Sequence, residues 1–112
     1  MRHKRLEPET IEAVADRLKV LAEPARLLIL NGLRDRPMNV SELIDETGLS
    51  QANLSKHLQL LYTHGFVARR RQRLWVFYSI ADPSVFVLCD IMCRQLKRHV
   101  AVRGNDRTKM AQ

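Results

Sequence analysis

Residues 51–64 form an amphipathic segment that constrains the fold of this chain more than any other. At about 100° per residue, one side of the segment is apolar and the other is small, polar and cationic. Ser50 is a good N-cap for a helix that starts at Gln51, and Gly65 suits the left-handed residue that follows a helix. A helix with defined ends at about 51 and 64 is therefore predicted. Its apolar side consists of Leu54, Leu58, Leu61 and Tyr62.

A shorter helical pattern, residues 40–46, precedes this long helix and is opened by the capping residue Asn39. The segment Thr47-Gly48-Leu49 separates the two patterns. Two helices joined by a short turn that contains glycine make a helix-turn-helix, in which the second helix enters the major groove of DNA. The sequence therefore predicts DNA binding, with residues 51–64 as the recognition helix.

Residues 66–80 predict a β-hairpin directly after the recognition helix. Two stretches rich in β-branched and aromatic residues, 66–70 and 74–80, flank a polar centre at 71–73. The hairpin tip is a run of arginine residues broken by one glutamine. A hairpin with a cationic tip after a helix-turn-helix forms a winged helix, whose wing lies along the phosphate backbone or a minor groove.

The predicted fold class is mainly α with a β-hairpin wing. Further helices are predicted from Glu9 to about Ala22, from Pro24 to before Asp35, and over about 83–100 with Asp82 as N-cap and Pro83 at N1. We expect a basic N-terminal arm at 1–8, one winged helix-turn-helix domain for DNA binding and dimerisation at 9–100, and a polar C-terminal tail at 101–112.

Charge and motif content narrow the function classes. The 112 residues include 19 Lys and Arg against 12 Asp and Glu, a net charge of +7 that suits a polyanionic partner. No apolar run follows the basic N-terminus, so we expect neither a signal peptide nor a membrane span but a cytoplasmic protein with its cysteines as thiols. No nucleophile stands at motif spacing from a histidine and an acid, and no glycine-rich phosphate loop occurs, which argues against an enzyme.

The first half of the last predicted helix, residues 85–93, is apolar nearly all round. A helix that is apolar on several faces has to be covered on more than one side. In so short a chain the second cover is expected to be another subunit, which predicts a homodimer.

Three segments of the chain resemble the ArsR/SmtB family of dimeric winged-helix repressors: Leu21–Leu30, Leu49–Leu58 and Val76–Ile80. The resemblance extends over roughly residues 10–100. It implies a dimer joined through its first and last helices, which binds double-stranded DNA at an imperfect inverted repeat and is released by a small inducer. It also places two groups of residues near DNA, namely Ser50, Gln51, Asn53, Ser55, Lys56 and Gln59 on the recognition helix, and Arg70, Arg71 and Arg73 on the wing. For His57, packing or a hydrogen bond is favoured over a base contact.

Two sensing sites known in the family are incomplete here. The family's thiol box resembles residues 39–43, where Asn39 and Ser41 stand in place of two cysteines. The interfacial zinc site on the last helix falls on Asp82, Ser84, Gln95 and Arg98, of which the first alone is kept. The protein is therefore expected to be neither a box-type arsenic sensor nor a nickel or zinc sensor of the last-helix type.

Cys89 and Cys93 are spaced i, i+4 and so share one face of the last helix. They are either small buried packing residues at the dimer seam or an inducer-responsive pair. As a sensor, the pair would bind a trivalent arsenical or another soft metal ion, or react with oxidants or reactive sulfur species. The leading hypothesis is a repressor released from its operator by such a thiol-reactive inducer. A winged-helix regulator without cysteine sensing and a protein-interaction module are the alternatives.

Overall fold

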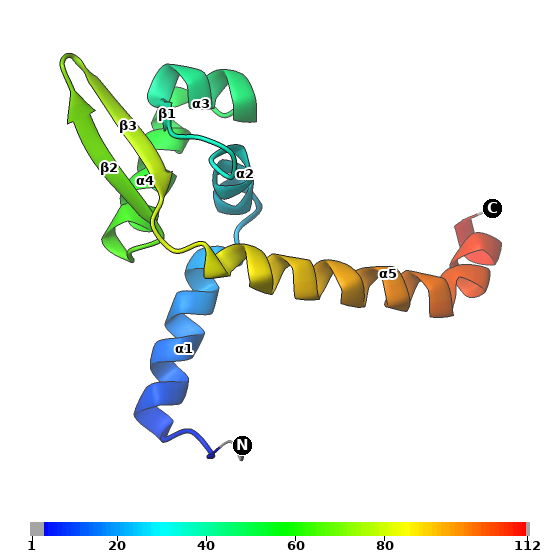
Figure 1. Ribbon diagram of the computed structural model, residues 1–112. Coiled ribbons are helices and arrows are strands. Elements are labelled where there is room, and N and C mark those ends of the chain that lie inside the picture. Colours follow the sequence, from blue (N-terminus) through cyan, green and yellow to red (C-terminus); the bar gives the residue numbers. More distant parts are fainter. Residues whose placement is uncertain (1–3, 112) are drawn as a thin grey trace. The chain divides into compact units, whose positions relative to one another are not determined.

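A computed structural model describes the backbone of residues 4–111 and the side chains of residues 4–100. The chain folds as two units, Met1–Ala81 and Asp82–Gln112. The elements of the first unit are α1 (Pro8–Leu21), α2 (Pro24–Gly32), β1 (Met38–Asn39), α3 (Val40–Thr47), α4 (Gln51–Thr63), β2 (Val67–Gln72) and β3 (Trp75–Ile80), and the second unit contains α5 (Ser84–Ala111) (Figure 1).

The core of the first unit lies where α2, α3 and α4 pack together. Its largest fully buried side chains are Ile29, Leu30, Leu33, Leu43, Leu54, Leu58 and Leu61. The three leucine residues of α4 are those predicted from the helical spacing, which confirms the orientation of that helix. Tyr62, predicted on the same apolar side, is instead more than a third exposed and lies beneath the guanidinium of Arg69.

Local hydrogen bonds define both helices of the helix-turn-helix. Asn39 Oδ1 accepts from the backbone N–H of Glu42 at 2.8 Å, and Glu42 Oε1 accepts from the backbone N–H of Asn39 at 3.0 Å, which together form a capping box. Gly48 ends α3 with a φ of 73°, a left-handed conformation that glycine adopts without strain. Ser50 Oγ then accepts from the backbone N–H of Asn53 at 3.2 Å and opens α4. The predicted caps of both helices are confirmed.

The wing belongs to a three-stranded antiparallel sheet of order β1-β3-β2. The two long strands pair from Val67 opposite Ile80 to Gln72 opposite Trp75, and leave a two-residue turn between them. The predicted hairpin is confirmed. The prediction of a two-stranded sheet was incomplete, because the sheet has a third strand. Met38 and Asn39 add the third strand by pairing with β3, and a two-residue strand has too little pattern to be found from sequence.

The last helix differs from its prediction at both ends. It begins at Ser84 rather than Pro83, and Asp82 Oδ1 accepts from the backbone N–H of Ser84 at 3.1 Å. It continues beyond residue 100 to Ala111, so residues 101–111, expected as a polar tail, are helical. Alanine, arginine, lysine and methionine in this stretch favour helix, and an existing helix gains one hydrogen bond for each residue added. In the described part of the chain, no helix is long and apolar enough to cross a membrane.

Candidate nucleic-acid interface

The six residues predicted to lie near DNA on α4 are all exposed, at its N-cap or along its outer face. Two of them also hold the helix itself. Ser50 uses its hydroxyl oxygen as the N-cap, and Gln59 Nε2 donates to Thr63 Oγ1 at 3.3 Å. The first turn of α4 contains no acidic residue, so the partial positive charge at its N-terminus favours a nearby phosphate.

Charge is strongly segregated around α4 and the wing. Residues 48–81 contain no aspartate or glutamate. The same range contains five permanent cations, which are Lys56, Arg69, Arg70, Arg71 and Arg73. A contiguous stretch of chain with only positive charge attracts a polyanion and gains affinity through counterion release.

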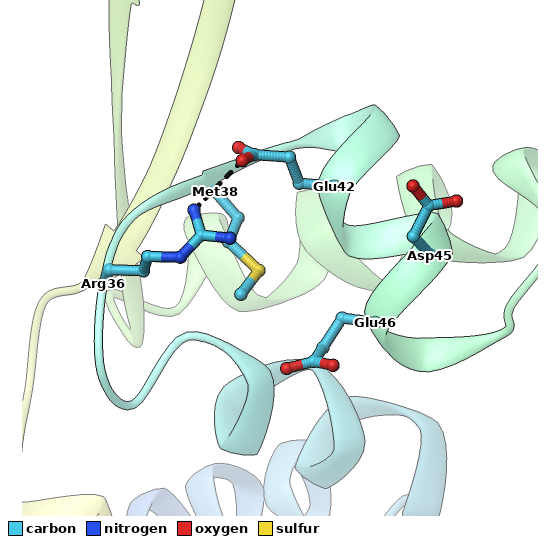
Figure 2. Close-up of a pocket in the computed structure, with 5 residues that line it drawn as sticks. All are labelled: Arg36, Met38, Glu42, Asp45 and Glu46. Atoms are coloured by element: carbon cyan, nitrogen blue, oxygen red, sulfur yellow. Dashed lines mark hydrogen bonds and ion pairs between the residues drawn. The ribbon is translucent and has the colours of Figure 1, made fainter.

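The outer side of α3 has the opposite character. Figure 2 shows Glu42, Asp45 and Glu46 of α3 with Arg36 and Met38 around a hollow of about 360 Å³. Arg36 Nη1 donates to Glu42 Oε2 at 3.0 Å. The pKa of Glu42 is lowered, first by the hydrogen bond from the Asn39 backbone and then by Arg36. Because this side is acidic, it disfavours a phosphate backbone, and DNA is directed toward α4 and the wing.

The three predicted wing arginine residues do not share one face. Along β2, Arg71 points to the same side as Arg69, whose guanidinium carbon lies 4.0 Å from the centre of the Tyr62 ring of α4. Arg70 is paired with Phe77 on the other side of the sheet. Arg71 Nε donates to the backbone oxygen of Arg73 at 3.3 Å, which brings these two residues together at the tip.

Among the residues that the structure describes, Arg73 is the non-glycine residue with a positive φ, and its φ is 60°. It occupies the first position of the two-residue turn, where type I′ and II′ hairpin turns require such a backbone angle. Glycine is the usual residue at such a position, and in this wing arginine adopts the left-handed conformation. A residue of this kind in that conformation costs about 1 kcal/mol or more, so the turn is strained at a position that displays a cation.

The side chain of His57 on α4 is positioned by a hydrogen bond from Arg26 of α2. Arg26 Nε donates to His57 Nδ1 at 3.2 Å, and Arg26 Nη1 donates to the backbone oxygen of Val20 at 3.1 Å. The histidine is half-buried, so the preference for a packing and hydrogen-bonding role agrees with its position. This contact joins the last turn of α1, α2 and the middle of the recognition helix.

A second arginine, Arg17 of α1, fixes the end of the recognition helix. Its Nη1 donates to the backbone oxygen of His64 at 3.0 Å, and its guanidinium carbon lies 4.2 Å from the centre of the Phe66 ring. Sequence reasoning missed both Arg17 and Arg26, because the partners are far apart in the chain. The presence of Arg26 and His57 in two of the segments that resemble the family was the available signal.

Both cysteines lie on α5 as free thiols, Cys89 half-buried and Cys93 exposed. Helical spacing places Cys89 beside the exposed apolar side chain of Met92, three residues further along α5. At the position of the family's zinc site, the Asp82 carboxylate accepts from the backbone and hydroxyl of Ser84. Among the residues whose side chains are described, no cluster of three His, Cys, Asp or Glu residues could hold a metal ion.

Comparison with known proteins identifies close relatives over most of the chain. The model of the bacterial regulatory protein arsR family matches residues 23–69. The uncharacterized HTH-type transcriptional regulator Rv0081 of Mycobacterium tuberculosis is 39% identical over 90 residues, which are 80% of this chain and 79% of that protein. The biofilm growth-associated repressor of Xylella fastidiosa is 34% identical over 89 residues, with 76% of this chain and 78% of that protein covered.

Solved structures agree with this result. The crystal structure of Rv0081 superposes with a TM-score of 0.77 at 37% identity, and the match covers 88% of this chain and 98% of that one. A homodimeric winged helix-turn-helix DNA-binding domain, fragment 1–100 of Mb0332 from Mycobacterium bovis, gives a TM-score of 0.71 at 26% identity over 88% of this chain and 95% of that one. The chain therefore belongs to the ArsR family of bacterial regulatory proteins, as a winged helix-turn-helix transcriptional regulator and not an enzyme.

Proposed function

We propose that this regulator represses transcription by binding, as a homodimer, an inverted-repeat operator in double-stranded DNA. The observation that carries the proposal is the charge distribution: residues 48–81 present α4 and the wing without a single acidic side chain. The printed name of the Xylella relative, a repressor, supports the direction of control. A protein-interaction module is the weaker alternative. A protein surface whose formal charges are all positive is typical of proteins that bind nucleic acid, whose backbone is rich in phosphate.

Dimerisation is supported by apolar side chains that the single chain leaves exposed. On α1 these are Ile11, Val14 and Leu18, and on α5 they include Leu88, Met92, Leu96 and Val100. Apolar stripes of this kind on a soluble chain mark interaction surfaces. The related Mb0332 domain is described as homodimeric. We infer that a second subunit covers both stripes, and a two-fold axis between subunits matches a two-fold symmetric operator.

Within the operator, we assign base reading to the exposed amide and hydroxyl side chains of Gln51, Ser55 and Gln59. Lys56 is assigned to a phosphate or a guanine, since an ammonium group can reach either. Arg71 and Arg73 at the tip of the wing are assigned to phosphates. Phosphate contacts give affinity that is independent of sequence, and amide contacts to base edges give the discrimination.

Replacing Gln59 with alanine tests the assignment of base reading. An operator is first selected from random DNA with the purified protein. The Gln59→Ala variant is then expected to lose about 1–3 kcal/mol of binding free energy on that operator, with little change on random DNA, by fluorescence anisotropy at fixed salt. Thr63→Ala is the matched control, because it removes the 3.3 Å hydrogen bond to Gln59 but leaves the amide in place. Equal losses on both DNAs would show that Gln59 does not read sequence.

We further propose that the inducer acts on Cys89 and Cys93. The two thiols are free, lie one helical turn apart, and Cys89 adjoins the apolar stripe of α5. Arsenite, As(OH)3, would exchange two of its hydroxide ligands for the two cysteine sulfur atoms, and the two thiol protons would leave with these hydroxides as two water molecules. An oxidant such as hydrogen peroxide would first convert one thiolate to a sulfenic acid. Either product changes the packing of a helix assigned to the dimer seam, and a coupling of about 1–3 kcal/mol to DNA binding is sufficient for induction.

The double variant Cys89→Ser/Cys93→Ser tests this sensor. It is expected to bind the operator like the parent but to remain bound when treated with arsenite, hydrogen peroxide or polysulfide, by fluorescence anisotropy. The parent should be released by at least one of the three, and that reagent identifies the chemistry as metalloid, oxidant or sulfur transfer. If the double variant responds to the same reagent as the parent does, the cysteines are packing residues and the protein does not sense through them.

A further inference from the structure

The tip of the wing exposes two large apolar side chains that neither folding nor the turn requires. Leu74 is 88% exposed and Trp75 is 55% exposed. Turns of two residues favour glycine, asparagine, aspartate or serine, so the turn itself gives no reason for a leucine. Leu74 and Trp75 are consecutive, so two exposed apolar side chains stand at one end of the hairpin, and tryptophan is enriched at interaction surfaces.

The wing holds this apolar pair in a fixed position. The ladder of β2 and β3 continues without interruption to Gln72 opposite Trp75, so the turn begins directly after the last pair. The hydrogen bond from Arg71 to the backbone oxygen of Arg73 closes the turn, and Arg73 adopts a φ of 60° there. The two side chains are therefore presented at the end of a paired ribbon, and both are exposed there.

The charge around the wing tip indicates which kind of molecule would bind this apolar surface. Every formal charge between residues 48 and 81 is positive, and four of the cations are wing arginine residues. An apolar protein partner would have to bring acidic groups to match them. Duplex DNA provides both features in one surface, since phosphates border a minor groove whose walls are apolar deoxyribose rings.

We propose that Leu74 and Trp75 pack against deoxyribose rings in the minor groove of the operator, while Arg71 and Arg73 of the same wing tip contact phosphates. The inference rests on the proposed DNA binding and adds an apolar component to it. Apolar packing of this kind removes surface from water without neutralising a phosphate. Its contribution to affinity is therefore independent of salt and of base sequence.

The test compares two double variants with the parent on operator and random duplexes across a salt series. Leu74→Ala/Trp75→Ala is expected to weaken binding to both duplexes about tenfold with the salt slope unchanged. Arg71→Gln/Arg73→Gln is expected to weaken binding and to flatten the slope of log affinity against log salt by about two units. The single variant Leu74→Ala serves as a control for folding, because its site is 88% exposed and the substitution should not affect the fold. It should show part of the loss of DNA affinity seen in the double variant.

Trp75 supplies an independent readout because it is the single tryptophan of the chain. Addition of operator DNA to the parent is expected to shift its emission to shorter wavelength, as the indole leaves water. An unchanged spectrum, or unchanged affinity of Leu74→Ala/Trp75→Ala while the arginine variant flattens the salt slope, overturns the apolar contact and leaves DNA binding intact. If the parent itself binds neither duplex, the proposed function fails instead.

Discussion

Replacing Met92 with glutamate is expected to turn the regulator into monomers that no longer hold the operator. Met92 is 50% exposed in the single chain, so the fold of one subunit tolerates a carboxylate there. In the proposed dimer the same position is buried, and an unpaired charge in such a seam costs several kcal/mol. A monomer also reaches one half-site instead of two, and loses the second set of contacts. Sedimentation at several protein concentrations and anisotropy on the selected operator measure both effects.

Arg94→Ala is the matched control for this prediction. It changes the charge by the same single unit, and it lies on the opposite side of α5 from Met92, fully outside the apolar stripe. This variant should stay dimeric and bind the operator almost as the parent does. A Met92→Glu protein that sediments as a dimer with unchanged stability would show that α5 does not form the seam.

Features determined by neighbours in the chain were predictable from sequence. The caps at Asn39 and Ser50 depend on hydrogen bonds to residues three positions ahead, and the side chains themselves identify them. Gly65 has a φ of 77° just after α4, as expected for a residue that follows a helix. The three buried leucine residues of α4 follow from helical spacing alone.

Features that depend on distant segments were not predictable. β1 exists because Met38 and Asn39 meet β3, and nothing in the two residues themselves indicates a strand. The hydrogen bond between Arg26 and His57 joins residues 31 positions apart, and its geometry exists only after α2 and α4 have packed. A packing or hydrogen-bonding role was predicted for His57, but the sequence alone does not identify Arg26 as its partner.

The candidate interface shows the same division. Exposure of the polar residues on α4 was predictable, since it is the complement of the buried face. The distribution of wing arginine residues was not, because the expected strand stretch ended at Arg70, whereas β2 continues to Gln72. Successive side chains of a strand point to opposite faces, so Arg70 lies on one side of the sheet and Arg71 on the other. The arginine run therefore presents cations to two sides of the sheet.

Replacing Leu61 with alanine is expected to cause a large loss of stability, as it would at the other buried leucine positions of the recognition helix. The Leu61 side chain is completely buried, and it lies in the core that α2, α3 and α4 form. A buried leucine truncated to alanine loses transfer free energy and leaves a cavity, at a cost of about 2–5 kcal/mol. For a chain of this size that lowers Tm by about 10 °C or more. Thermal unfolding followed by circular dichroism, at one fixed protein concentration, measures the loss.

Leu74→Ala makes the same chemical change at a position that is 88% exposed, and it separates the two roles of leucine in this protein. Because little of its side chain leaves water on folding, its free energy of unfolding should change by less than about 0.5 kcal/mol. Its effect is expected on DNA affinity instead, whereas Leu61→Ala should lose stability first and bind DNA in proportion to the folded fraction. Equal Tm values for the two variants would contradict the packing of α4 described above, since one leucine is buried in the core and the other faces solvent.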